Sequence, residues 1–320
     1  MQVFHGLPTR SLRDPVLAIG NFDGVHLGHR ALFEAARAGA RARGGEAVVL
    51  TFEPHPARVL APALAPPLLT SLPRKLELLG EAGLDATIVL PFTRELAARS
   101  AGEFVEEILL AGVGARELVV GFDFTYGKKR EGTVRSLRAD GELRGFSLQV
   151  IPPVAIDGLV VSSTKIRELL HEGNAAGARM LLGRPYDVEG PVVRGAGRGR
   201  TIGIPTANVA AEAELLPRPG VYAGEVTLLG PGGWTRPAAI NLGSNPTFRT
   251  GAGGGRLSLE AHVLDHEEDL YDRRVRVGFG AWLRGEERFP DAAALIAQIR
   301  KDILAVKASL SDNPTMKSTP

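Results

Sequence analysis

Residues 16–29 read VLAIGNFDGVHLGH. The first five form a short apolar run typical of a buried strand, and a glycine-containing turn then leads into a segment with helical periodicity. Such strand, turn and helix units build parallel sheets, because the crossover between parallel strands is usually a helix. The turn also predicts a ligand site, since the free N–H groups and positive dipole end of a helix N-terminus attract phosphate.

The first half of the chain repeats this alternation. Further short runs rich in β-branched residues predict strands over 47–52, 86–90, 117–121 and 146–151. Amphipathic stretches predict helices over 27–43, 73–82, 101–111 and 132–139. We therefore expect a doubly wound parallel sheet with helices on both faces, in which ligands bind beyond the carboxyl ends of the strands.

The second half has a different pattern, in which strands follow one another across Gly/Pro turns without helices between them. These strands are predicted over 187–193, 220–229, 236–242, 257–264 and 274–279. The pattern favours a small antiparallel β-barrel, closed by a helix over 291–310. The fold class is thus α/β plus β. We expect one domain over 1–183, a barrel domain over 184–310 and a frayed polar tail over 311–320.

The composition limits the function classes. A chain of 320 residues suggests two domains, and the absence of cysteine excludes disulfides, zinc–thiolate sites and cysteine nucleophiles. No apolar run approaches the roughly 18 residues of a membrane span, and the N-terminus lacks the pattern of an export signal, so we expect a cytoplasmic protein. A net charge of +2 argues against a nucleic-acid surface and favours small-molecule partners. The oligomeric state is left open.

The first candidate site is the pair His26 and His29. Spaced three apart, they lie on one helical face and can donate to the same anion. Two imidazoles, neutral or protonated, suit an α-phosphate whose charge grows during attack on a nucleotide. The plainer alternative makes one histidine a helix cap and the other a surface residue. A zinc site is disfavoured because a third ligand is missing.

The second candidate site is VSSTKIR, residues 161–167. Its hydroxyls suit a helix N-cap, which alone explains them. The cap does not explain Lys165 and Arg167 in the first turn, where the helix dipole disfavours cations unless an anion is bound nearby. The segment therefore predicts a second set of contacts to a triphosphate.

Four motifs together carry a family resemblance. GNFDGVHLGHRAL (20–32), TFEPHPARVL (51–60), VGFDFTYGKKREG (120–132) and VSSTKIREL (161–169) resemble the adenylyltransferase half of the prokaryotic bifunctional riboflavin kinase/FMN adenylyltransferases, or FAD synthetases. The resemblance covers about 14–183 and implies a nucleotidyltransferase-like Rossmann sheet. HxGH alone is shared with pantetheine-phosphate adenylyltransferase and class I aminoacyl-tRNA synthetases, so the combination is what is specific.

This resemblance implies roles for individual residues. The implied ATP contacts are Gly20, Phe22, His26, Gly28, His29, Ser163, Thr164 and Arg167. Asp123 and His55 are implied to line the nucleotide or flavin pocket. A plain Asx-turn is the alternative for Asp123, because it follows a strand end.

The third candidate site is RGAGRGRTIGIPTAN, residues 194–208. Gly195 and Gly197, with Arg198, permit a phosphate to meet backbone N–H groups. Thr206 and Asn208, two apart in an extended segment, point their oxygens the same way, and hard oxygen ligands suit Mg²⁺. The string is no Walker A motif, and an ordinary β-turn is the alternative. It resembles the riboflavin kinase signature.

Glu260 is the candidate base of the second half. Strand alternation puts it on one face with Ser258 and His262, so a surface glutamate is the alternative. The kinase resemblance, over about 184–305, implies that Glu260 takes the proton of the ribityl 5′-hydroxyl and that Asn241 lies beside the flavin. The sequence departs from the family in the insert 251–255 and in Asp272-Arg273-Arg274, where the family has glycine.

These observations predict two enzymes in one chain. The barrel would phosphorylate riboflavin to FMN with Mg²⁺ and ATP, and the α/β domain would transfer AMP from ATP to FMN, releasing pyrophosphate and forming FAD. The alternatives are a nucleotidyltransferase acting on another small phosphorylated substrate and a flavin-binding protein without turnover. An RNA-binding role would appear as an electrophoretic shift at physiological salt.

Overall fold

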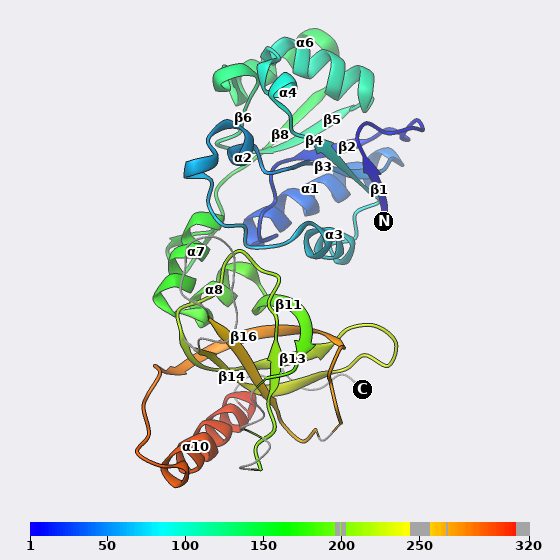
Figure 1. The fold of residues 1–320 in the computed structure, drawn as a ribbon. Helices are drawn as coiled ribbons and strands as arrows, with labels where there is room; N and C mark the ends of the chain where they lie inside the picture. The colour runs from blue at the N-terminus through cyan, green and yellow to red at the C-terminus, as the bar shows by residue number, and fades with distance from the viewer. Residues whose placement is uncertain (196–198, 200–202, 244–256, 267, 312–320) are drawn as a thin grey trace. The chain divides into compact units, whose positions relative to one another are not determined.

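The chain divides into two compact units, Met1–Ser163 and Thr164–Pro320 (Figure 1). The computed structural model describes residues 1–195, 199, 203–243, 257–266 and 268–311. Gly197, Arg198, the insert 251–255 and residues 312–320 of the expected tail lie outside the described residues. The contacts group residues 164–182 with the barrel, whereas the sequence predicts a domain boundary at 183. The boundary at which the halves function alone stays a prediction.

The first unit is built on six parallel strands in the order β1-β4-β3-β2-β5-β8. The strands are β1 (Gln2–His5), β2 (Val16–Ile19), β3 (Ala47–Glu53), β4 (Ala86–Pro91), β5 (Glu117–Gly121) and β8 (Ser147–Ile151). All five predicted strands are present. The edge strand β1, which pairs with β4, was not predicted, because four residues are too few to show a period.

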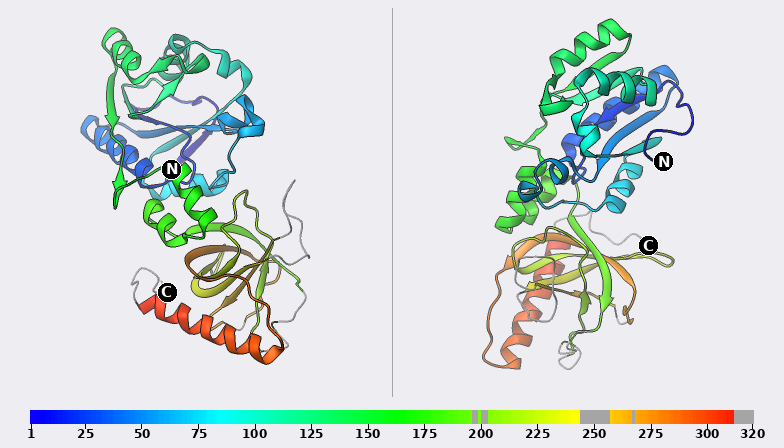
Figure 2. Two further views of the ribbon diagram at one scale, coloured as in Figure 1. Left: turned by 90° about the vertical axis from the view of Figure 1, so that its left-hand side faces the viewer. Right: turned by 45° about the horizontal axis from the view of Figure 1, so that its top comes forward.

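Helices cover both faces of this sheet, as Figure 2 shows. The helices are α1 (Leu27–Arg43), α2 (Pro56–Leu60), η1 (Pro62–Leu64), α3 (Leu72–Glu81), α4 (Arg94–Ala98), α5 (Ala101–Glu103), the π-helix η2 (Phe104–Gly112), η3 (Lys128–Arg130) and α6 (Val134–Arg144). Two short hairpins complete the unit: β6 (Thr125–Tyr126) with β7 (Gly132–Thr133), and β9 (Ala155–Ile156) with β10 (Leu159–Val160). The predicted helix over 101–111 is one α-helical turn that continues as the π-helix.

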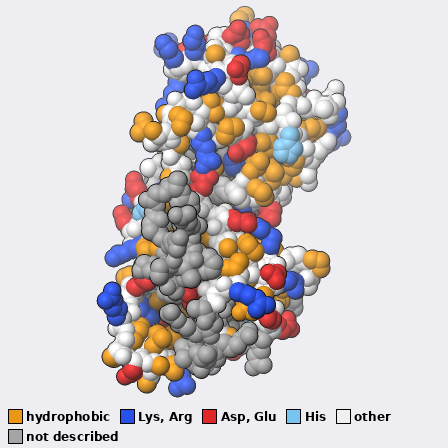
Figure 3. Space-filling model, viewed as in Figure 1, with side chains coloured by type: hydrophobic (Ala, Val, Ile, Leu, Met, Phe, Trp, Pro, Cys, Tyr) orange, Lys and Arg blue, Asp and Glu red, His pale blue; other side chains and the backbone are white. Residues whose placement is uncertain are grey.

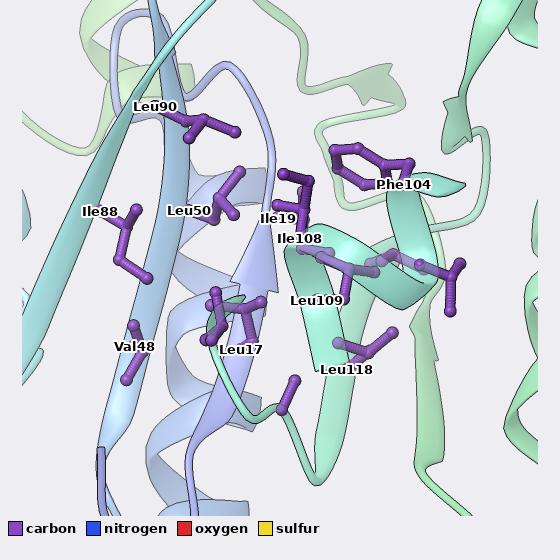
Figure 4. Close-up of a cluster of buried hydrophobic side chains, with 14 of the residues drawn as sticks. Leu17, Ile19, Val48, Leu50, Ile88, Leu90, Phe104, Ile108, Leu109 and Leu118 are labelled. Carbon is purple, nitrogen blue, oxygen red and sulfur yellow. The ribbon is translucent and has the colours of Figure 1, made fainter. Parts of the chain in front are cut away.

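Alternation along each strand divides the core into two clusters. Val16 and Ala18 pack against α1 and α3 on one face, while Leu17 and Ile19 pack against η2 on the other (Figure 4). Each fully buried leucine or isoleucine contributes roughly 1.5–3 kcal/mol through the apolar area it removes from water. The predicted doubly wound sheet is confirmed.

The second unit is a closed antiparallel barrel in the order β11-β12-β15-β14-β13-β16. Its strands are β11 (Tyr186–Val193), β12 (Ala207–Val209), β13 (Gly220–Leu228), β14 (Thr235–Gly243), β15 (Ser258–Val263) and β16 (Arg274–Arg284). The helices are α7 (Ser163–Glu172), α8 (Ala175–Leu182) and α10 (Ala292–Ser311). The predicted barrel is confirmed, and only β12, three residues long, was not predicted.

The closing helix α10 packs on β13 and β14, and α8 packs on β11 and β16. Arg284 donates to the buried carboxylate of Asp302, with Nη2 to Oδ2 at 2.8 Å, so an ion pair joins β16 to α10. Removing one partner of such a buried pair is strongly destabilising, because the other charge is left uncompensated. The predicted closing helix is therefore joined to the barrel both by packing and by an ion pair.

The surface carries both signs of charge. Basic and acidic side chains are interspersed on the face shown in Figure 3, in keeping with the balanced composition. Within the part of the chain that the structure describes, every helix is too short or too polar to cross a membrane.

Candidate functional site

The turn between β2 and α1 is strained and tightly packed. Phe22 and Val25 adopt φ values of 50° and 42°, a region that costs a non-glycine residue on the order of 1–3 kcal/mol. The Phe22 ring offsets part of this cost by packing edge-on against Phe33 at 4.9 Å and against His29 at 5.1 Å between ring centroids. The turn is held in one conformation by its surroundings.

The two predicted histidines lie together at this turn. His26 is the N-cap of α1, where its Nδ1 accepts a hydrogen bond from the His29 N–H at 3.2 Å. The two rings stack with centroids 3.5 Å apart and planes 17° from parallel. A Cβ at Gly28 would lie 3.1 Å from the His26 ring, so glycine keeps room for the stack. His26 is therefore a cap, as the plainer interpretation held, but His29 is no simple surface residue.

The surroundings of His29 favour its neutral form. Burial, then the charges of His26 and Lys75, lower the pKa of His29 well below its usual value. Its Nδ1 is buried and finds no hydrogen-bond partner among the residues that the structure describes. Of the two protonation states left open by the sequence, the structure favours the neutral imidazole, whose single N–H is a hydrogen-bond donor.

The second motif reaches the same turn through Ser163. Its Oγ donates to the backbone carbonyl of Asp23 at 2.9 Å. Lys165 pairs with Glu168 at 3.1 Å, so its position in the first turn of α7 is explained without a bound phosphate. Thr164, exposed, and Arg167, half-buried, lie in the second unit at the start of α7. Arg167 thus stays the candidate cation of this motif.

A cavity of about 1100 Å³ opens beyond the carboxyl ends of the strands of the first unit. Gly20 and Asn21 of the turn line it, together with His55 and Asp123, whereas His26 and His29 are not among its lining residues. His55 also caps α2, its Nδ1 accepting from the Ala57 N–H at 3.2 Å. Asp123 is exposed in the turn after β5, and its predicted role is not tested by this geometry.

The sequence missed the aromatic walls of this cavity. Its walls include Phe52, Phe92, Phe104, Phe124 and Tyr126, and its rim carries Lys128, Lys129 and Arg130. The walls include an edge-on Phe52–Phe92 pair at 5.6 Å. Aromatic walls with a cationic rim suit a planar ring that carries a phosphate. The available signal was the position of Phe52 and Phe92 at the carboxyl ends of β3 and β4.

In the barrel, three predicted residues form one row across neighbouring strands. Asn208 of β12 pairs in register with Glu260 of β15, and Glu260 pairs with Asn241 of β14. Cross-strand partners place their side chains side by side on the same face of a sheet. All three are half-buried, whereas Leu259 and Ala261 point into the barrel core.

Gly195, which begins the glycine-rich segment, lies against this row. A Cβ added at Gly195 would overlap the side-chain amide of Asn208, so only glycine fits there with the present Asn208 rotamer. His262 lies 2.8 Å from the carbonyl oxygen of Pro205 through Nδ1, which must be the donor because a carbonyl only accepts. This hydrogen bond joins β15 to the segment that carries Thr206.

A second cavity, of about 410 Å³, adjoins Thr206. Pro205, His266 and Tyr271 are among its lining residues, and the Arg194 guanidinium lies over the Tyr271 ring at 5.2 Å. The sequence did not point to His266 or Tyr271. The described residues hold no group of three or more His, Cys, Asp or Glu side chains arranged for a metal.

Comparison with known proteins assigns both halves. The family model for FAD synthetase matches residues 9–165, and the model for riboflavin kinase matches residues 182–310. The bifunctional riboflavin kinase/FMN adenylyltransferase of Escherichia coli K12 is 40% identical over 303 residues, covering 95% of each chain. The enzyme of the same name from Bacillus subtilis is 32% identical over 300 residues, covering 93% of each chain.

Among solved structures, a Streptococcus pneumoniae protein described as a macrolide-efflux protein matches with a TM-score of 0.83 and 28% identity. The match covers 95% of this chain and 98% of that one, so both units of the fold recur there. The two family models and the relatives agree on the two reactions, and the models place FAD synthetase before riboflavin kinase along the chain. The chain therefore belongs to the bifunctional riboflavin kinase/FMN adenylyltransferases, enzymes that use ATP to make FMN from riboflavin and FAD from FMN.

Proposed function

We propose that the first unit carries adenylyl transfer at the β2–α1 turn and that the barrel carries phosphoryl transfer at the row Asn208, Glu260 and Asn241. The register of that row is the observation that supports the assignment most strongly, because three distant stretches of sequence meet in it. Each reaction uses its own ATP.

In adenylyl transfer, a phosphate oxygen of FMN attacks the α-phosphorus of ATP, a new P–O bond forms, and pyrophosphate leaves with the electron pair of the broken bond. The attacking oxygen is already anionic, so no base is needed. His29 and the backbone N–H groups of the turn donate hydrogen bonds to the phosphates as negative charge shifts toward the leaving pyrophosphate. Gly20, Phe22 and Gly28 shape this turn. Ser163, Thr164 and Arg167 are proposed to hold the rest of the triphosphate. The 1100 Å³ cavity, with His55 and Asp123, would hold the flavin.

In phosphoryl transfer, the Glu260 carboxylate accepts the proton of the ribityl 5′-hydroxyl while that oxygen attacks the γ-phosphorus and ADP leaves. Asn241, beside Glu260 in the row, would position the flavin. Gly195 and the glycine-rich segment would hold the phosphates, Tyr271 and His266 would line the nucleotide cavity, and Gly197 and Arg198 stay predictions.

The Thr206 hydroxyl and the Asn208 amide oxygen fit Mg²⁺, which takes hard oxygen ligands and commonly uses few protein groups alongside ATP phosphates. The ion, when bound, would neutralise phosphate charge. Asn208 is held in place for this role by the close approach of Gly195, and Thr206 by the hydrogen bond of His262 to Pro205.

The substitution Gly195→Ala tests the contact with Asn208. The added methyl group displaces the Asn208 amide, so we expect FMN formation to fall by about tenfold or more, since small misplacements of a positioning group are costly. Flavin chromatography after incubation with riboflavin and ATP gives the rate. Gly285→Ala is the matched control, because its Cβ meets nothing nearer than 4.0 Å. Equal kinase rates in the two variants would rule out this role of Gly195.

Separate expression tests the division of labour. Residues 1–184 are expected to convert FMN to FAD, and residues 184–320 to convert riboflavin to FMN. A shorter fragment, 1–163, follows the contact boundary but lacks Thr164 and Arg167, so we expect it to make little FAD. If fragment 1–184 melts cooperatively and binds ATP and FMN yet makes no FAD, the adenylyltransferase site needs the barrel.

A cytoplasmic location and the lack of a nucleic-acid partner stay predictions. The balanced net charge of +2 supports the second of them. A shift of labelled RNA by the protein at physiological salt would contradict it.

A further inference from the structure

A buried cation lies beside the β2–α1 turn. Lys75 of α3 is 3% exposed, and its Nζ donates to the backbone carbonyl of Asn21 at 3.0 Å. Lysine is almost never fully buried unless it is paired, because taking its charge out of water is costly. Asn21 lines the 1100 Å³ cavity, whereas Lys75 does not. Lys75 is therefore linked to the cavity wall through its hydrogen bond to the Asn21 carbonyl.

Residues 69–75 hold the turn at several points. The Asp23 carboxylate accepts from the N–H groups of Leu69 at 3.0 Å and Thr70 at 3.2 Å, and Thr70 Oγ1 accepts from the Gly24 N–H at 3.1 Å. The Asn21 carbonyl accepts a second hydrogen bond, from Thr51 Oγ1 at 3.1 Å. Among these contacts Lys75 alone contributes a positive charge.

The charge of Lys75 interacts with carboxylates on one side of the turn and with His29 on the other. Burial lowers the pKa of Lys75, and the carboxylates of Asp23 and Glu53 raise it. On the other side, Lys75 is one of the two charges, with His26, that lower the pKa of His29. Asp23 is 2% exposed, so Lys75 supplies a positive charge near a buried carboxylate that lies beside the proposed phosphate site.

We propose that Lys75 is a positioning residue for adenylyl transfer, one that fixes the Asn21 carbonyl and the turn that follows it and offsets the charge of Asp23 where the ATP phosphates arrive. The inference rests on the proposed function of the turn. A rigid turn with a positive charge beside it strengthens the binding of the ATP triphosphate. The kinase reaction of the other unit does not depend on this turn.

The test is Lys75→Met in the full-length chain. The KM for ATP in FAD formation is expected to rise roughly tenfold or more, because a hydrogen bond from a charged donor is lost and the site becomes more negative. FMN formation from riboflavin should stay at the parent rate. Lys75→Arg keeps the charge and a donor, so its KM for ATP should return to within about threefold of the parent.

Arg74→Met is the matched control. Arg74 is the preceding residue of α3 and is also buried, at 7% exposed, but it pairs with Glu77 and Glu81. Its loss should lower the melting temperature without changing the KM for ATP. The NMR titration of His29 gives a readout independent of turnover: its pKa should rise in Lys75→Met, with the effect of His26 remaining, and stay low in Lys75→Arg.

The measured KM values for ATP decide whether Lys75 positions the turn. The inference fails if Lys75→Met keeps the parent KM for ATP, if Arg74→Met raises that KM equally, or if folded Lys75→Arg restores nothing. Should Lys75→Met not melt cooperatively, Lys75→Gln removes the charge with a polar side chain in its place, and a parent KM for ATP there overturns the inference. Suppose that Lys75→Met keeps the parent KM for ATP. If His29→Ala then also leaves FAD formation unchanged, the proposed function of the turn fails as well. If His29→Ala is inactive in FAD formation, only the role of Lys75 fails.

Discussion

His29→Ala is expected to lower FAD formation from FMN by about a hundredfold, since removing one preorganised donor to developing charge costs on the order of 3 kcal/mol of barrier. The neutral His29 ring is stacked on His26 and packed edge-on against Phe22. The alanine variant removes that donor and leaves the cap made by His26 in place. FMN formation from riboflavin should continue at nearly the parent rate.

Chromatography of the flavins measures both reactions in one incubation. With riboflavin and ATP, the His29→Ala chain should accumulate FMN, whereas the parent should proceed to FAD. The kinase reaction serves as an internal control for folding of the second unit. His5→Ala, at the exposed end of β1, is the matched histidine control and should leave both rates unchanged. Unchanged FAD synthesis in His29→Ala would remove the turn from the proposed mechanism.

Local pattern was enough to predict most of the fold. The predicted helix over 27–43 coincides with α1, because Gly44 stops it in the left-handed conformation, at φ 65°, and Gly20 and Gly24 precede it. Among the strands of the six-stranded sheet and the barrel, those that were missed are β1 and β12, which are four and three residues long. These strands form because they pair with strands that are distant in sequence, and local periodicity does not reveal such pairing.

The candidate site was only partly predictable for the same reason. Motifs identified residues within single stretches, such as His26 with His29, but the register that aligns Asn208, Glu260 and Asn241 is a tertiary property. Lys75 was overlooked because a basic residue in an amphipathic helix is typical of a solvated face. Its burial follows from the packing of α3 against the turn, where the Asn21 carbonyl accepts a hydrogen bond from its Nζ.

The row in the barrel leads to the second large expected effect. Glu260→Gln preserves the shape of the side chain and its place beside Asn208 and Asn241, but it removes the proton acceptor. The kcat for FMN formation should therefore fall by roughly a hundredfold or more, while riboflavin binding changes little. A loss in kcat without a loss in binding separates a base from a residue that only holds the flavin.

The supply of FMN distinguishes this variant from His29→Ala. Given riboflavin and ATP, Glu260→Gln should form neither FMN nor FAD at an appreciable rate, yet added FMN should restore FAD synthesis in full, because adenylyl transfer needs no group of the barrel row. Glu287→Gln, at an exposed glutamate of the same unit, should behave as the parent. Kinase turnover within a few-fold of the parent in Glu260→Gln would mean that the proton goes to another acceptor and that Glu260 is a surface residue of β15.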